Sequence, residues 1–319
     1  MIDYTELSTR EAYGKIITEM GAVDTRIVVL DADLSRSVMT KYFAQAHPGR
    51  FFQCGLAEQN MISIAAGLAS CGKIPLASTF AVFASCRCFD QVRMCVAQPK
   101  ANVKIVSTHG GITVGEDGSS HQAIEDLALY CSLPNFNVIA PSDSIETVEA
   151  IKAAIATDGP FYVRLGRSKT PVIYANGCKF KLGQADMLLD GRDASIIATG
   201  IMVSKSIEAA NLLKLDGVHC RVLNMSTLKP VDRLSIIAAA ADTGAIVTAE
   251  EHLLHGGLGS IVAQVLSANI PVPRVSLGID ETYCQSGKPD ELLEMNGLTA
   301  PAIAAAVRDV VTKKNKRYT

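Results

Sequence analysis

Short apolar runs alternate with helix-like stretches along almost the whole chain, and this alternation is the strongest constraint on its fold. The strand-like runs are 26–30, 74–79, 103–108, 137–141 and 161–165 in the first half, and 194–198, 220–223, 245–249 and 272–277 in the second. Between them, apolar residues recur with helical spacing. Runs that are apolar throughout are typical of strands buried on both faces. The alternation therefore predicts an α/β fold with parallel sheets covered by helices.

A change in composition near the middle divides the chain. Lysine, proline, asparagine and glycine are enriched between about Ser168 and Ala185, and such residues are typical of loops and linkers. A chain of 319 residues is long enough for two domains with a core each. We therefore expect a first α/β domain over residues 1–170, a linker over 171–186 and a second α/β domain over 187–319.

Composition and charge argue against several classes of protein. Hydrophobic residues make up 48% and charged residues 19% of the chain, which favours a globular protein over a disordered one. The net charge is -2 and the basic tail Lys313–Arg317 is read as a solvated helix end, so we expect no nucleic-acid partner. No apolar run approaches a membrane span. The nine cysteines lack paired metal-binding spacing, and with no visible signal peptide they predict reduced, apolar fillers in a cytoplasmic protein.

An acidic residue at the head of an apolar helix is the first candidate for chemistry. Glu58 follows the segment 51–55, whose beginning is interpreted as a buried strand, and precedes the apolar segment 61–69. Burial raises the pKa of a carboxyl group unless a partner takes up its charge, and functional carboxylates often occupy such environments. The structural alternative is an ordinary acid in a first helical turn, where the helix dipole favours negative charge.

Further polar clusters follow strands of the first half. Ligands of open α/β sheets bind beyond the carboxyl ends of the strands, where this sequence places the segments 33–37, 109–111 and 115–122. Taken singly, each has a structural alternative: segment 115–122 as a surface loop, and His109 as a core histidine. The remaining candidates would be surface charges or core aromatics: Arg10, Arg167, Phe80 and Phe83.

In this order, the segments resemble the carboxyl-terminal half of transketolase. The resemblance covers essentially the whole chain, and its motifs recur at matching spacing in segments 9–10, 32–37, 55–60, 78–83, 108–122 and 165–168. It implies a pyrimidine-binding domain for thiamine diphosphate, followed by the C-terminal domain of that family. Glu58 would be the glutamate that activates the cofactor, and Phe80 and Phe83 would hold its aminopyrimidine ring.

The resemblance also implies the residues that meet the sugar. His109 and His121 would be catalytic, because histidines can move protons and donate to a developing oxyanion. Arg10, Ser37 and Arg167 would bind the phosphate, since a guanidinium can donate two hydrogen bonds to it at once. The full expected substrate-binding set is Arg10, Asp33, Ser37, His109, Asp117, His121 and Arg167, and no residue of the chain is expected to bind a metal ion.

One signature of a complete transketolase is missing from this sequence. That family binds the diphosphate through Mg²⁺ with Gly-Asp-Gly and a later asparagine, and no Gly-Asp-Gly occurs here. We therefore expect a split transketolase that moves a two-carbon ketol unit from a ketose phosphate to an aldose phosphate. A separate subunit would carry the diphosphate-binding domain and most contacts to Mg²⁺ or Ca²⁺. The resemblance implies an α2β2 assembly, with this chain inactive alone.

Other readings remain open at this point. The β subunit of a 2-oxo-acid dehydrogenase has similar domains and the same glutamate, but Arg10, Arg167 and the segment 117–121 suit a phosphorylated, hydroxylated donor better. A deoxyxylulose-phosphate synthase is normally one long chain. A non-catalytic regulatory subunit is a further alternative. Segment 250–259 mimics a metal or phosphate motif and is interpreted as a glycine turn before a helix, with His255 in the core or at an interface.

Overall fold

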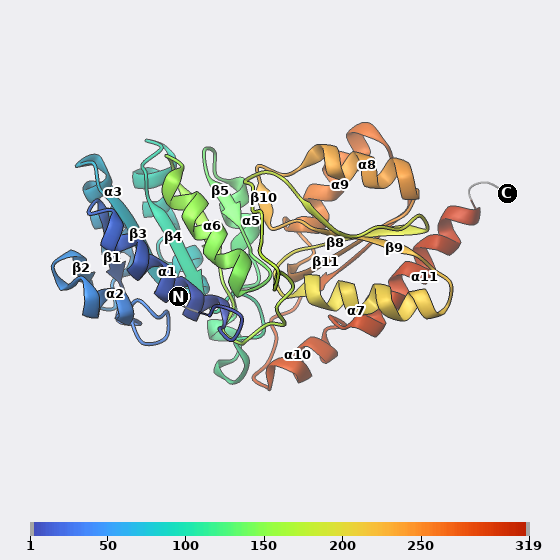
Figure 1. The fold of residues 1–319 in the computed structure, drawn as a ribbon, viewed down its shortest axis with the longest axis horizontal. Coiled ribbons are helices and arrows are strands. Elements are labelled where there is room, and N and C mark those ends of the chain that lie inside the picture. The colour runs from blue at the N-terminus through green and yellow to red at the C-terminus, as the bar shows by residue number, and fades with distance from the viewer. Residues whose placement is uncertain (1–2, 317–319) are drawn as a thin grey trace.

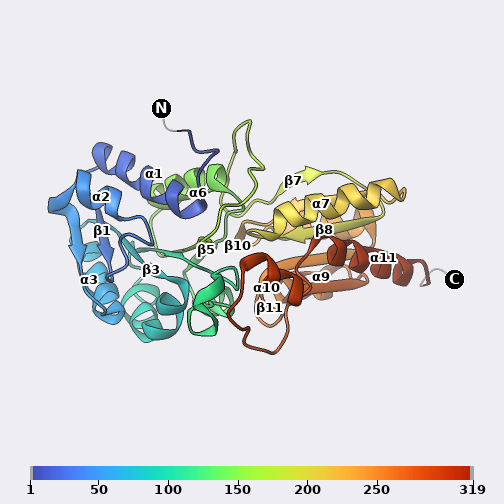
Figure 2. The same ribbon diagram turned by 90° about the horizontal axis from the view of Figure 1, so that it is seen from below.

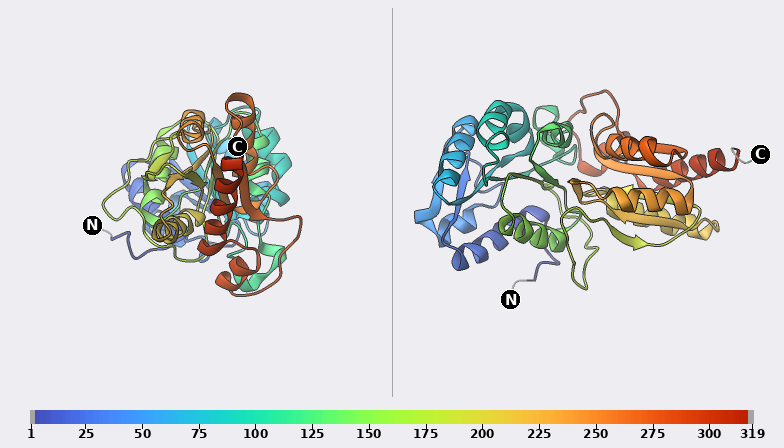
Figure 3. Two further views of the ribbon diagram at one scale, coloured as in Figure 1. Left: turned by 90° about the vertical axis from the view of Figure 1, so that its right-hand side faces the viewer. Right: turned by 90° about the horizontal axis from the view of Figure 1, so that it is seen from above.

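The computed structural model describes residues 3–316, with side chains for residues 3–315. Two α/β units lie side by side along the long axis of the molecule (Figures 1 and 3). Each unit is built on one mainly parallel sheet, which confirms the expected fold class. Of the basic tail, Lys313 and Lys314 belong to the last helix, α11 (Ala300–Lys316), whereas Arg317 lies outside the described residues.

The first sheet has seven strands in the order β10-β5-β6-β4-β3-β1-β2. All neighbours are parallel except β10 and β5. Every residue of β1, β3, β4 and β6 is buried, as expected for central strands of a parallel sheet covered on both faces. The strands are β1 (Ile27–Asp31), β2 (Phe51–Gln53), β3 (Ile74–Phe80), β4 (Lys104–Thr108), β5 (Asn137–Ile139), β6 (Phe161–Arg164) and β10 (Thr227–Lys229).

Helices cover both faces of this sheet, because successive strand residues point to opposite sides. On β1, Val29 packs in a cluster with α1 and α6, whereas Leu30 packs in another with α3. Helix α1 begins after Ser8, whose N–H and hydroxyl donate to the Glu11 carboxylate at 2.9 and 2.6 Å. The helices are α1 (Thr9–Val23), α2 (Lys41–Ala46), α3 (Glu58–Ser70), α5 (Asp126–Ser132) and α6 (Ser144–Ala156).

The second sheet has five strands in the order β12-β11-β8-β9-β7, and only the β7 pairing is antiparallel. Helices α8 and α9 cover one face, and α7 and α11 cover the other (Figure 1). The strands are β7 (Asp186–Leu189), β8 (Ala194–Ala198), β9 (Cys220–Asn224), β11 (Ile246–Leu253) and β12 (Arg274–Ile279). The helices, besides α11, are α7 (Met202–Leu215), α8 (Arg233–Thr243), α9 (Leu258–Asn269) and α10 (Pro289–Met295).

Three expectations are corrected. Strand β2 is an edge strand with Phe52 39% exposed, so it is not buried. The helix expected to begin at Phe83 is broken into η2 (Phe83–Arg87) and η3 (Val92–Ala97), both π-helical turns, with α4 (Phe89–Gln91) between them. The Ala84 carbonyl accepts the Tyr130 hydroxyl at 2.8 Å, which satisfies a backbone group in the wide turn. The cysteines are not all apolar fillers, because two of them, Cys71 and Cys86, are exposed.

Among residues 3–316, no helix is long and apolar enough to cross a membrane.

Candidate active site

Glu58 is the first residue of α3, and its side chain is completely buried. Gly55, with φ of +70°, turns the chain between β2 and this helix. The Arg87 guanidinium lies against the carboxylate, and its Nη1 donates to Oε1 at 2.9 Å and to Oε2 at 3.0 Å. The Arg87 side chain is 46% exposed. A buried charge is therefore paired with a cation that reaches it from the surface, as buried charges require.

Four aromatic rings gather beside this ion pair. Phe80 ends β3 and pairs in register with Thr108, the last residue of the neighbouring strand β4, so His109 emerges next to Phe80. The Phe80 ring stacks on the His109 imidazole with centroids 3.9 Å apart, and it lies 5.7 Å from Phe83. The His121 ring stands edge-on to Phe83 at 5.5 Å. The structure thus brings together four candidates from three separate segments.

The electrostatics of His109 follow from burial and from nearby cations. The residue has φ of +61°, its side chain is almost fully buried, and its Nδ1 lies 2.7 Å from the Thr108 hydroxyl. Burial, together with the positive charges of Arg10 and Arg167 and the adjacent His121, lowers the pKa of His109 to about 3. The imidazole is therefore neutral near pH 7, where it can donate or accept a hydrogen bond but carries no charge.

The second domain holds the loop that carries the other candidates. Glu251, on β11, accepts the backbone N–H of Thr113 at 2.6 Å, and a Cβ on Gly111 would lie 2.2 Å from the Glu251 carboxyl carbon. The Gln122 side chain donates to the Gln285 carbonyl at 3.2 Å. Figure 2 shows α10 beside this loop. The path of segment 110–122 is therefore set by the carboxyl-terminal half of the chain.

A pocket of about 430 Å³ brings together the two arginines expected at the phosphate. Arg10 donates from Nε to the Arg167 carbonyl at 3.0 Å and from Nη1 to the Ser37 carbonyl at 2.9 Å. Arg167 donates to the Val114 carbonyl and pairs with Glu116 at 3.0 Å. The volume falls in the range of small-molecule sites. The lining residues are Ser8, Arg10, Glu11, Glu116, Arg167, Ser168, Lys169 and Pro289.

Asp33 and Asp117 are exposed, and among the described residues neither side chain makes a hydrogen bond to the arginines or the ring cluster. Asp33 has φ of +62°, and its N–H donates to the Gln53 side chain at 2.8 Å. The buried acid of that segment is Asp31, which accepts the Thr40 hydroxyl at 2.7 Å. Asp117 ends a short helical turn in the loop held by the second domain. The structure therefore leaves both aspartates exposed, and only Asp117 directly follows a residue that lines the pocket, Glu116.

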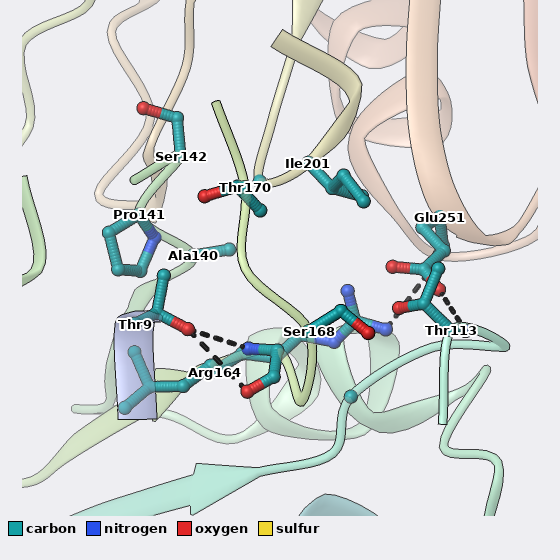
Figure 4. Close-up of a pocket in the computed structure, with 14 residues that line it drawn as sticks. Thr9, Thr113, Ala140, Pro141, Ser142, Arg164, Ser168, Thr170, Ile201 and Glu251 are labelled. Atoms are coloured by element: carbon teal, nitrogen blue, oxygen red, sulfur yellow. Dashed lines mark hydrogen bonds between the residues drawn. The ribbon is translucent and has the colours of Figure 1, made fainter. Parts of the chain in front are cut away.

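A smaller cavity of about 30 Å³ lies deeper, between the two domains (Figure 4). Thr9, Arg164 and Glu251 are among its lining residues. One water needs roughly 10–15 Å³ of such volume, so the cavity has room for about two waters. It is too small for a sugar phosphate and does not border Glu58.

Two cations beside these sites were not expected from the motifs. Arg87 lies four residues after Phe83, a spacing that places side chains on one helical face, but no local pattern reveals that it also reaches Glu58. Lys169 follows Arg167 by two positions and lines the same pocket. Its signal was the short basic cluster at the end of the first domain.

Segment 250–259 stabilises the start of helix α9. The buried Glu250 carboxylate accepts the N–H groups of Leu258 and Gly259 at 2.6 and 2.7 Å, at the start of α9. Of the two places expected for His255, the core or an interface, the core is excluded, because its side chain is 79% exposed and lies 3.1 Å from Glu281. In the described part of the chain, no group of three or more His, Cys, Asp or Glu side chains could hold a metal ion.

Comparison with known proteins agrees with this geometry. The family model described as the transketolase pyrimidine-binding domain matches residues 5–172, and that of the transketolase C-terminal domain matches residues 183–303. The fold and site thus define a protein of the thiamine-dependent class. The chain belongs to the transketolase family, and its function is of the transketolase kind.

Individual relatives refine the comparison. A protein of Methanocaldococcus jannaschii named for a transketolase C-terminal section is 45% identical, over 96% of each chain. A 6-deoxy-6-sulfo-D-fructose transketolase subunit of a Clostridium species is 42% identical, over 97% of this chain and 96% of that one. Human transketolase is 39% identical over 97% of this chain but only 50% of its own. A solved structure described as a split-gene transketolase, an inactive β4 tetramer, has 49% identity and a TM-score of 0.91, covering 97% of this chain and 99% of that one.

Proposed function

We propose that this chain is the pyrimidine-binding subunit of a split transketolase acting on ketose and aldose phosphates, with those of the pentose phosphate pathway as default substrates. The observation that carries the proposal is the buried Glu58 carboxylate, whose partner Arg87 lies over the Phe83 ring, in the same chain as a 430 Å³ pocket lined by Arg10 and Arg167. Its domains would comprise residues 1–170 and 187–319 with a linker over 171–186, in keeping with the two family matches.

Thiamine diphosphate fits the residues around Glu58. Glu58 and Phe83 already hold a flat, nitrogen-bearing cation, the Arg87 guanidinium, so a carboxylate and an aromatic face suited to an aminopyrimidine are present. When bound, the cofactor supplies the carbon nucleophile for the ketose carbonyl. Glu58 would hold a proton at a pyrimidine ring nitrogen, and Phe80 and Phe83 would pack against the ring.

The remaining candidates would act on the sugar. His109 is neutral and would donate or accept a hydrogen bond at the reacting end, and His121 would move protons there. Asp117 would accept a sugar hydroxyl. The phosphate would bind in the 430 Å³ pocket, to Arg10, Arg167 and Ser37, with Asp33 as a further substrate contact. We assign these as substrate-binding roles, with His109 and His121 also catalytic.

A separate subunit would complete the site. Two relatives that match this chain over nearly their whole length are named for a transketolase C-terminal section and a split-gene transketolase. By analogy, the chain alone would be inactive and would form an α2β2 assembly with a diphosphate-binding subunit that holds most of the Mg²⁺ or Ca²⁺ ligands. Exposed apolar side chains around α3 support a partner there: Phe52, Leu56, Ile64 and Met94. The free cysteines suit the reducing cytoplasm.

The test combines a thermal shift with a turnover assay. The chain is assayed alone and with the product of the neighbouring reading frame, in the presence of thiamine diphosphate, Mg²⁺, xylulose 5-phosphate and ribose 5-phosphate. A ligand that binds the folded state raises its stability by about 2.7 kcal/mol at a hundredfold excess over its Kd. We expect both the shift and the two-carbon transfer only in the mixture. Full activity of the chain alone would refute the split arrangement.

A sulfonated ketose is a second candidate donor. It is supported by the relative named as a 6-deoxy-6-sulfo-D-fructose transketolase subunit. Sulfonate and phosphate are both anions whose oxygens a guanidinium can bind, so the arginine pocket suits either. The same mixture is therefore assayed with each donor at equal concentration. Cofactor binding without transfer from either donor would point instead to other ketose phosphates or to 2-oxo acids.

A further inference from the structure

The Arg87 guanidinium occupies the space between the two groups that we assign to the cofactor. Its Nη1 bonds both oxygens of Glu58, at 2.9 and 3.0 Å, and its Cζ lies 4.1 Å from the centre of the Phe83 ring. Arg87 and Phe83 are the two ends of the π-helical turn η2, which brings the cation over the ring. A flat cation therefore already makes two hydrogen bonds to the carboxylate and a cation–π contact with the aromatic ring.

An aminopyrimidine needs the same two contacts. It is also flat, it carries nitrogens that can bond a carboxylate, and it stacks on aromatic faces. Both Glu58 oxygens and one face of Phe83 are engaged by Arg87. We propose that Arg87 competes with the cofactor's pyrimidine ring for Glu58 and Phe83. In the free subunit the guanidinium occupies both groups, and it moves out when the ring enters. This inference rests on the proposed function and adds a control on cofactor entry.

Glu58 is buried whereas Arg87 is partly exposed, and this difference allows Arg87 to leave the carboxylate and return to it. Glu58 is completely buried, so leaving it without a partner is unfavourable, and Arg87 stays until another partner replaces it. Arg87 is 46% exposed, and among the described residues its Nε and Nη2 have no hydrogen-bond partner. It can therefore turn into water without breaking other hydrogen bonds. The pyrimidine replaces the guanidinium through the proton that Glu58 shares with its ring nitrogen, and until the ring enters, Arg87 keeps the free subunit closed.

A binding experiment on the isolated chain tests the competition directly. The probe is the free pyrimidine part of thiamine, 4-amino-5-hydroxymethyl-2-methylpyrimidine, titrated by calorimetry into the wild type and into Arg87→Met, which keeps the unbranched stem but not the guanidinium. We expect the variant to bind the probe at least tenfold more tightly. Millimolar methylguanidinium should compete with the probe in the variant and have no effect on the wild type. Arg93→Met is the matched control, because Arg93 lies on η3 and, among the described residues, its side chain donates a hydrogen bond only to the Met94 sulfur.

The opposite role predicts the opposite result. If Arg87 instead positions Glu58 for the cofactor, Arg87→Met binds the probe equally or more weakly, and the competitor proposal is overturned.

The same variants are titrated with thiamine diphosphate in the mixture with the partner subunit. Tighter binding by Arg87→Met than by wild type supports the competitor. Wild-type binding with no gain in the variant overturns only this inference, whereas a wild-type mixture that binds no cofactor overturns the proposed function itself. Thermal unfolding of each variant confirms that it is folded.

Discussion

The carboxylate of Glu251 accepts the backbone N–H of Thr113 at 2.6 Å, across the boundary between the two domains. Glu251 lies on β11 of the second sheet, and Thr113 lies in the loop after β4 of the first. Since that loop continues to His121, the second domain supports the site without contributing to the ring cluster. The C-terminal domain therefore positions the loop that carries two of the expected sugar-binding residues, Asp117 and His121.

The contact between this loop and Glu251 predicts that Gly111→Ala strongly destabilises the protein. Gly111 has φ of +80°, and an added Cβ would lie 2.2 Å from the Glu251 carboxyl carbon. Overpacking and an unfavourable φ together should lower the free energy of unfolding by about 2–5 kcal/mol. Denaturant unfolding measures the loss, and sugar turnover by the reconstituted mixture should fall because the loop is displaced.

Gly72→Ala is the matched control for this change. Gly72 also has positive φ, +78°, but no atom lies within 4 Å of its added Cβ. It should show only the backbone cost, about 1–2 kcal/mol, with turnover retained. Equal losses in the two variants would mean that the contact with Glu251 is unimportant.

The role of Glu58 predicts the loss of turnover in Glu58→Gln. The amide keeps the shape of the side chain but cannot hold an acidic proton at the pyrimidine. General acid–base groups contribute roughly 10²–10⁴-fold to rates, so activity of the mixture should fall at least about a hundredfold. The chain should still fold, as measured by thermal unfolding. The surface change Glu149→Gln is the control, and wild-type activity in Glu58→Gln would disprove the assignment.

His109 should stay neutral in the folded chain to well below pH 6. Burial and the charges of Arg10 and Arg167 lower its pKa to about 3, against about 6.5 in an unfolded chain. Between these values the unfolded state binds the extra proton, so this group's contribution to stability is present above about pH 6.5 and is lost as pH falls toward 3. NMR of ¹⁵N-labelled histidine reports the titration. Arg10→Gln should raise the pKa of His109, whereas Arg26→Gln, a distant exposed arginine, should not; equal effects would exclude the local charge as a cause.

The sequence predicts the buried framework better than its edges. Strands β1, β3, β4 and β8 are buried throughout, and the structure has them within one residue of the expected bounds. The short antiparallel strands β7 and β10 have no comparable pattern, and β10 pairs with β5 from a distant part of the chain. Their positions depend on tertiary contacts, which local periodicity does not contain.

In the candidate site, too, the sequence predicts some contacts and not others. The contact between Phe80 and His109 could be anticipated, since residues at the carboxyl ends of neighbouring parallel strands meet at one edge of a sheet. The contact of Arg87 with Glu58 could not, because it depends on a π-helical turn where an ordinary helix was expected. Such turns often occur at functional sites, but they have no strong sequence signal.

The arginine pocket predicts selective effects on anionic donors. Arg167→Met removes charge-assisted hydrogen bonds worth about 1.5–3 kcal/mol, so kcat/KM for a ketose phosphate should fall by roughly 10- to 150-fold in the mixture. An uncharged ketose should lose much less. Lys169 is exposed, so Lys169→Met should cost only a few fold, as surface charges do.

Glu116→Gln should act in the opposite direction. Glu116 pairs with Arg167 at 3.0 Å and is itself 65% exposed, so it competes with an incoming anion for that guanidinium. Removing its charge should lower KM for the phosphorylated donor a few fold and leave the uncharged ketose unchanged. Steady-state kinetics with both donors measure the contrast. A KM that rises in Glu116→Gln would mean the opposite: Glu116 holds the Arg167 guanidinium in the position where it binds the anion.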